Sequence, residues 1–180
     1  VIEESSVSAE LGQDSIEKGV LAGILATLAL VIYMILSYFR FGVYTTSALF
    51  VNALLVLGLM SIFNATLTLP GIAGFVLTIG AAVDANVLIN ERIREELRRG
   101  RQTMQAVEFG YKEASTAIFD ANITNVISAV ILFWFGSGPI KGFAVVLALG
   151  IATSVFTGVT FTRLLVSQYL QRNRPKTLNL

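Results

Sequence analysis

Two acidic side chains interrupt long apolar stretches of this sequence, and both are candidates for proton chemistry. Asp84 lies within the run 71–90, and Asp120 lies within the run 114–135. An aspartate near the centre of a membrane-spanning helix costs about 2.5 to 3.5 kcal/mol on insertion scales, so such residues tend to serve a function. The sequence has no histidine and no cysteine, so proton exchange near neutral pH would depend on carboxyl groups. We expect the two aspartates to carry the chemistry of this chain.

Helical periodicity places other polar residues around the two aspartates. Asp84 shares one helical stripe with Glu91, which predicts a proton relay of these two carboxyl groups, and Asn86 and Asn90 fall on the opposite side of that helix. In the other run, Asp120 shares a stripe with Thr116 and Thr124. The other polar side chains of the two runs are predicted to form a supporting polar layer: Asp120, Asn86, Asn90, Thr116, Asn122 and Thr124. The alternative is that these residues only hydrogen-bond between helices and fix their packing. No metal site and no cofactor are predicted.

The elements that must position these residues are membrane-spanning helices. Apolar residues make up 54% of the chain and charged residues only 14%. Five apolar runs of about 20 residues match the length that crosses a hydrocarbon core of about 30 Å. The predicted spans are 19–38, 42–62, 71–90, 114–135 and 140–162. The sequence therefore predicts an all-α integral membrane protein, a bundle of five transmembrane helices. We expect 71–90 and 114–135 to be central and the uniformly apolar 19–38 to be peripheral.

One of the four predicted connections is long. Residues 91–113 are predicted to form a cytoplasmic interfacial loop of two helical pieces, broken near Gly100. Met104, Val107 and Tyr111 share a face that we expect to rest on the bilayer surface or on a partner. The predicted organisation is a periplasmic remnant of an upstream domain at 1–18, the five-span bundle at 19–166 and a basic cytoplasmic tail at 167–180.

Basic residues predict the orientation of the bundle. If the five spans alternate, eleven of the 13 Lys and Arg residues fall on one side, and Lys18 and Lys141 fall on the other. Because the basic side is cytoplasmic in membrane proteins, the N-terminus is predicted to be periplasmic and the C-terminus cytoplasmic. The basic cluster at 98–101 is better explained by this topology and by lipid headgroups than by nucleic acid.

Four sequence blocks, in order and at consistent spacing, resemble the SecD family of protein-export membrane proteins. They are TLPGIAG at 68–74, AVDANVLINERIREE at 82–96, FDANIT at 119–124 and GSGPIKGFA at 136–144. The resemblance implies a six-span membrane part related to the resistance-nodulation-division transporters. It also implies that the first span and a large periplasmic domain are missing here.

The resemblance also implies a function. Proteins of this family are multi-pass proteins of the bacterial inner membrane, which pair with SecF and act with the SecYEG translocon on the exported polypeptide. They use the proton-motive force to drive late polypeptide translocation. By position, Asp84 matches the family's proton-carrying aspartate, whose cationic partner is expected from SecF, and Asp120 matches a second aspartate motif.

Two other functions deserve a test. One is a structural scaffold of the translocon without proton coupling, in which the polar residues only bind partner helices. The other is an intramembrane aspartyl protease, since two acids on neighbouring spans could activate water. The sequence argues against the protease, because Asp84 lacks the preceding Gly-x-Gly of presenilin-like proteases and no Pro-Ala-Leu element occurs. We therefore do not expect an enzyme.

Overall fold

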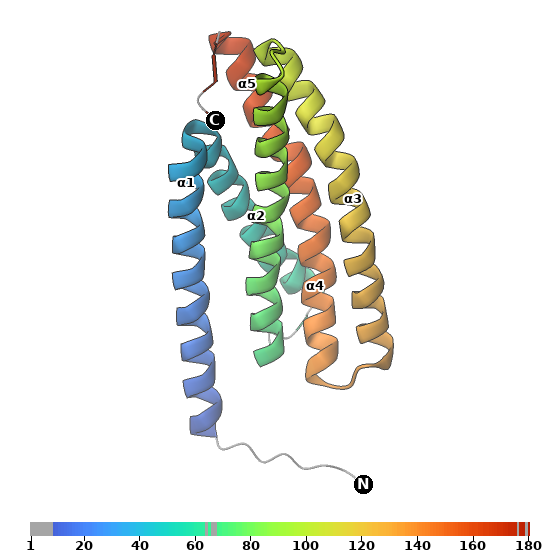
Figure 1. Cartoon of the computed structure of the whole chain (residues 1–180). Helices are drawn as coiled ribbons and strands as arrows, with labels where there is room; N and C mark the ends of the chain where they lie inside the picture. Colours follow the sequence, from blue (N-terminus) through green and yellow to red (C-terminus); the bar gives the residue numbers. More distant parts are fainter. Residues whose placement is uncertain (1–8, 64, 66–67, 176, 179) are drawn as a thin grey trace.

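The computed structural model describes residues 9–63, 65, 68–175, 177–178 and 180, and the secondary-structure elements of this part of the chain are all helices (Figure 1). The elements are α1 (Ala9–Ile62), α2 (Leu69–Arg98), α3 (Thr103–Phe135), α4 (Pro139–Val155), the π-helical segment η1 (Phe156–Phe161) and α5 (Thr162–Asn173). The last three form one continuous rod. The prediction of an all-α membrane protein is confirmed, because the described helices include four that are long and apolar enough to cross a membrane.

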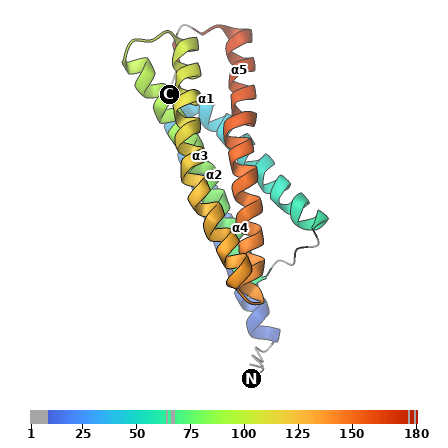
Figure 2. The same ribbon diagram turned by 90° about the vertical axis from the view of Figure 1, so that its right-hand side faces the viewer.

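The structure has four such helices, not the five that the sequence predicts. The difference lies in α1, which contains both predicted spans 19–38 and 42–62 without a loop between them. At Phe39 the backbone leaves the helical conformation, with φ 46° and ψ −113°, and the chain turns back on itself (Figures 1 and 2). The two arms approach closely just beyond this turn, since a Cβ atom on Gly42 would overlap the backbone carbonyl of Met34. A single residue thus replaces the predicted connection.

The predicted loop 91–113 is helical in two pieces, as expected, but these pieces belong to two long helices. Helix α2 is capped at its start by the hydroxyl of Thr68, which accepts a hydrogen bond of 3.3 Å from the Gly71 amide. The helix continues to Arg98, and its second half, residues 81–98, contains no glycine or proline that could end it earlier. Only residues 99–102 connect α2 to α3, and Gly100 supplies the positive φ of 84° that the turn requires. The break near Gly100 was predicted correctly, but the flanking pieces are the ends of two long helices.

The face expected to rest on the membrane surface belongs in large part to the core. Val107 and Tyr111 are buried in the main hydrophobic cluster of this chain, whereas Met104 is exposed. Tyr111 donates a hydrogen bond of 3.1 Å to the hydroxyl of Thr162 in α5. The periodicity of this segment therefore indicated a buried face, and the bundle itself covers that face.

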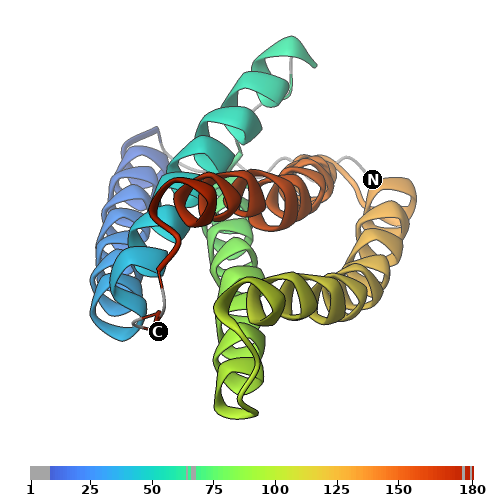
Figure 3. The same ribbon diagram turned by 90° about the horizontal axis from the view of Figure 1, so that it is seen from above.

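Helix α2 is central and α3 is not. Half of the residues in the most apolar stretch of α2 are buried, against 11% in α3. Seen from above, α2, α4 and the second arm of α1 meet near the middle, and α3 lies to one side (Figure 3). The prediction of a central position is thus confirmed for 71–90 and wrong for 114–135. The first arm of α1 is mostly exposed, which confirms its peripheral position.

Candidate functional site

Asp84 lies on the outward face of α2. Its side chain is exposed, although its neighbours Val83 and Ala85 are buried. Asn86 and Asn90 are buried on the opposite side of the helix, as the periodicity predicted, and the Asn86 amide donates to the Ala82 carbonyl at 2.9 Å. Within the described residues, no hydrogen bond or ion pair involves the Asp84 carboxylate. The chain alone does not compensate this carboxylate.

Asp120 lies on a second outward face, that of α3. Thr116 and Thr124 are exposed along the same stripe, one turn to either side of it. Asn122 is half-buried, and its amide donates to the Ile118 carbonyl of its own helix at 2.7 Å. In the part of the chain that is described, no hydrogen bond joins any two of the eight predicted site residues. The structure places them on two outward faces and in the interior, and does not join them into one closed layer.

Glu91 connects α2 to the first arm of α1. Its carboxylate accepts hydrogen bonds from the Tyr38 hydroxyl at 2.8 Å and from the Arg94 guanidinium at 2.6 Å. Arg94 also donates to the Ser37 carbonyl at 3.0 Å and lies 5.0 Å from the centre of the Tyr38 ring. Seven residues separate Glu91 from Asp84, which corresponds to about 10 Å along the helix. The predicted relay therefore has its second carboxylate held in place by two partners.

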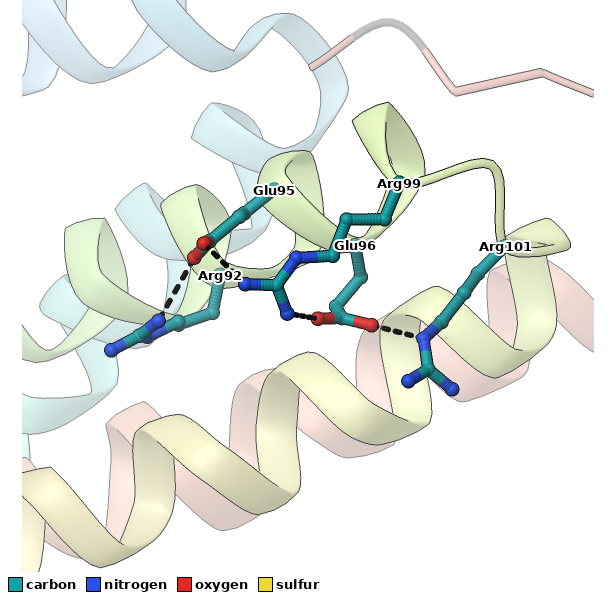
Figure 4. Close-up of polar contacts among 5 residues, drawn as sticks. All are labelled: Arg92, Glu95, Glu96, Arg99 and Arg101. Carbon is teal, nitrogen blue, oxygen red and sulfur yellow. Dashed lines mark hydrogen bonds and ion pairs between the residues drawn. The ribbon is translucent and has the colours of Figure 1, made fainter.

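An ion cluster clamps the connection between α2 and α3. Figure 4 shows its five members, Arg92, Glu95, Glu96, Arg99 and Arg101. The side chain of Glu96 is only 3% exposed, and it pairs with Arg99 at 2.6 Å and with Arg101 across the turn. Arg101 in turn lies over the ring of Phe109, 4.1 Å from its centre. The i,i+4 spacing of Glu95 and Arg99 is typical of a helical ion pair, and the two do pair at 2.8 Å, whereas the burial of Glu96 is not visible in any spacing.

The interior of the bundle also contains polar side chains, of which the sequence analysis predicted Asn86 and Asn90 and missed the others. The buried polar side chains are Thr45, Asn52, Thr78, Asn86, Asn90, Glu96, Thr153, Ser154, Thr157 and Thr162. Several of the hydroxyls donate to carbonyls of their own helix, as Thr78 does to Phe75 at 2.8 Å. The amide nitrogen and oxygen of Asn52 and the amide nitrogen of Asn90 have no partner among the described residues. The available signal was Asn52, the single asparagine in the apolar run 42–62.

Metal binding has no support in the arrangement of ligands. The described residues contain no group of three or more carboxylates, histidines or cysteines that could hold a metal ion.

Comparison with known proteins shows which family this chain resembles. The family model described as "Protein export membrane protein SecD/SecF, C-terminal" matches residues 1–172. Protein translocase subunit SecD of Calditerrivibrio nitroreducens is 52% identical over 163 residues, which cover 91% of this chain and 32% of that protein. Its counterpart in Escherichia coli K12 is 47% identical over 181 residues, covering all of this chain and 29% of that protein. The chain thus spans about a third of the length of these relatives.

Solved structures agree with the sequence comparisons. The crystal structure of SecDF, a translocon-associated membrane protein from Thermus thermophilus, superposes with a TM-score of 0.89 at 42% identity. The match covers 94% of this chain and 24% of that one. A second SecDF structure, in a super-membrane-facing form, gives a TM-score of 0.84 at 43% identity, over 90% of this chain and 22% of that one. This chain therefore belongs to the SecD/SecF family of protein-export membrane proteins.

Proposed function

We propose that this chain is the membrane part of a SecD-type protein translocase subunit, in which proton flow through Asp84 drives a late stage of polypeptide translocation. The relatives that support this role are named protein translocase subunits. In this proposal the chain sits in the bacterial inner membrane with residues 1–18 on the periplasmic side and 167–180 in the cytoplasm. Its partners are SecF, the SecYEG translocon and the exported polypeptide.

The uncompensated carboxylate of Asp84 is the observation that carries the proposal. Asp84 lies within a helix that is apolar enough to span the membrane, and it points outward from this chain. A charged aspartate facing lipid is costly, so membrane proteins keep such residues toward a partner, a cavity or a proton path. A SecF-type chain covering the outward faces of α2 and α3 would supply the missing cation. Protonation of Asp84 would then break this ion pair, and deprotonation would restore it.

The other predicted site residues have supporting roles in this proposal. Glu91 stands at the basic end of α2 and would exchange protons between Asp84 and the cytoplasm. Asp120, with Thr116 and Thr124, would extend the polar face that the partner covers. Asn86, Asn90 and Asn122 would stabilise the helices that present this face.

Export assays with the full-length protein test the proposal. Asp84→Asn preserves size and polarity but removes the exchangeable proton, so we expect proton-dependent export to fall on the order of 100-fold, the scale for losing a positioned proton-transfer group. Asp14→Asn is the matched control, because Asp14 is exposed near the start of α1 and pairs only with Lys18. The measurement is the rate of preprotein translocation into vesicles with and without a proton gradient.

Recovery of the partner proteins with the Asp84→Asn variant distinguishes the proton relay from the structural scaffold. Normal recovery of partners with loss of gradient-dependent export supports the relay. Undiminished export by Asp84→Asn overturns it. Failure to recover the partners, with proton flux unchanged in the complexes that do form, would indicate the scaffold instead.

A further inference from the structure

A cleft opens where the turn of α1 meets α5 and the C-terminal residues of the chain. It has a volume of about 400 Å³. Figure 1 shows the C-terminus beside the top of α1, at the end of the bundle where the cleft lies. Its walls are aromatic, basic and hydroxylic side chains together with one leucine: Phe39, Arg40, Phe41, Tyr169, Thr177 and Leu178.

Arg40 supplies a cation that this chain does not neutralise. Among the described residues, no carboxylate lies within ion-pair distance of its guanidinium. Its Nη1 donates a hydrogen bond of 3.3 Å to the Tyr169 hydroxyl, and its Cζ lies 5.6 Å from the centre of the Tyr169 ring. Tyr44 packs against the same ring at 6.0 Å. These contacts hold the guanidinium at the cleft and leave donors available for an anion.

Phe39, which lines the cleft, also belongs to an exposed apolar stripe on the first arm of α1. Phe39, Leu36 and Ile32 follow one another at helical spacing along the first arm of α1, and they are 60%, 70% and 57% exposed. The same arm contributes few residues to the core and is long enough to cross the membrane. An anion bound at Arg40 would thus have hydrocarbon contacts directly below it.

We infer that this cleft binds the phosphate headgroup of an anionic phospholipid, with the acyl chains lying along the first arm of α1. The planar guanidinium matches a phosphate through two parallel hydrogen bonds. Free phosphate would use Arg40 but not the stripe of Phe39, Leu36 and Ile32, and an acidic peptide would leave that stripe uncovered. Only a lipid joins both surfaces. The inference does not depend on proton transport by Asp84.

Lipid retention by the full-length protein tests the inference. The protein is reconstituted in nanodiscs that contain equal amounts of phosphatidylglycerol and phosphatidylcholine, and the lipids retained are measured by native mass spectrometry. We expect a preference for phosphatidylglycerol that falls about tenfold in Arg40→Gln, the order for one hydrogen bond to a charged group. Arg40→Lys retains the charge but not the planar guanidinium, so its preference for phosphatidylglycerol should lie between those of the unmodified protein and Arg40→Gln.

Lys112→Gln is the matched control. Lys112 is exposed on α3, which contributes no residue to the cleft, so this variant makes the same change in net charge away from it. An unchanged preference in Lys112→Gln, with loss in Arg40→Gln, supports the inference. Equal loss in both variants indicates a general effect of charge and overturns it. Displacement of phosphatidylglycerol by millimolar inorganic phosphate also overturns it, because a site for the free anion would then suffice.

Discussion

At the scale of single residues, Asn52 is the clearest conflict in the interior. It is 1% exposed, yet neither polar atom of its amide has a partner among the described residues. Val56, one helical turn from Asn52 in α1, belongs to a small apolar cluster against which Phe75 of α2 and Leu149 of α4 pack. Thr78 and Thr153 lie one turn from Phe75 and Leu149, toward the basic end, and each donates its hydroxyl proton to its own helix. The amide of Asn52 is thus buried without a hydrogen bond to the described residues.

We predict that Asn52→Leu raises the melting temperature of the purified protein. A buried polar group without a partner costs about 1–3 kcal/mol, and leucine removes that cost with a similar shape. Asn86→Leu is the control, because the Asn86 amide already donates at 2.9 Å and should gain less. Thermal unfolding in detergent measures both. A lower melting temperature for Asn52→Leu would mean that the amide is satisfied in the membrane by water or by another conformation.

Periodicity predicted which way individual residues face, but not what covers them. It placed Asp84 opposite Asn86 and Asn90, and the structure agrees. It also placed Asp120 on a stripe with Thr116 and Thr124, and all three are exposed along α3. Whether stripes on different helices meet in one polar layer depends on the order of the helices in the bundle. That order depends on long-range packing, such as the contact of Gly150 with Thr78, which no local pattern contains.

At the scale of elements, the reversal of α1 at Phe39 determines how the first two spans pair. The positive φ of this residue is uncommon outside glycine and costs about 1–3 kcal/mol in a bulky residue. The predicted spans 19–38 and 42–62 leave a short connection at residues 39–41, and the chain does reverse there. The sequence could not show that the turn would shrink to one strained residue, because hydropathy does not report backbone dihedrals.

Comparing two substitutions at this position isolates the backbone strain. Phe39→Gly and Phe39→Ala both remove the exposed ring, but only glycine adopts positive φ freely. We expect Phe39→Gly to be the more stable of the two by about 1 kcal/mol, after allowing for the greater freedom of glycine in the unfolded chain. The measurement is the melting temperature of each variant in the same detergent. Equal stability, or a more stable alanine variant, would contradict strain at this turn.

The prediction ended each helix where its apolar run ends, whereas in the structure a helix ends where its backbone hydrogen bonds end. The apolar run of α2 stops at residue 90, but the helix continues to Arg98. Ion pairs such as Arg92–Glu95 at 2.8 Å support this extension in a polar environment. A membrane-spanning segment and the helix that contains it therefore have different bounds, and an apolar run in the sequence shows only the bounds of the segment.

At the scale of the whole molecule, two outward surfaces differ in what they need from their surroundings. Residues 19–38, which make up most of the first arm of α1, form an apolar run that lipid alone can cover. The exposed face of α3 carries Asp120, Thr116 and Thr124, which lipid cannot hydrogen-bond. We therefore expect a protein partner on α3 and lipid on α1.

Photocrosslinking from two equally exposed positions tests this difference. Ile123 on α3 is 57% exposed and Leu25 on α1 is 58% exposed, so the two sites are matched in access. With a photoreactive amino acid at position 123, we expect crosslinks to a partner membrane chain in cells. At position 25 we expect crosslinks to lipid only. Partner crosslinks of similar yield from both positions would show that polarity does not select the covered face.

The one-residue reversal of α1 also bears on how this protein enters the membrane. The two arms have almost no water-soluble linker between them, and only Arg40 adds charge at the turn. An arm inserted alone would leave the other, equally apolar arm stranded in water. We therefore expect the two arms to form one insertion unit, a hairpin that enters the bilayer as a pair.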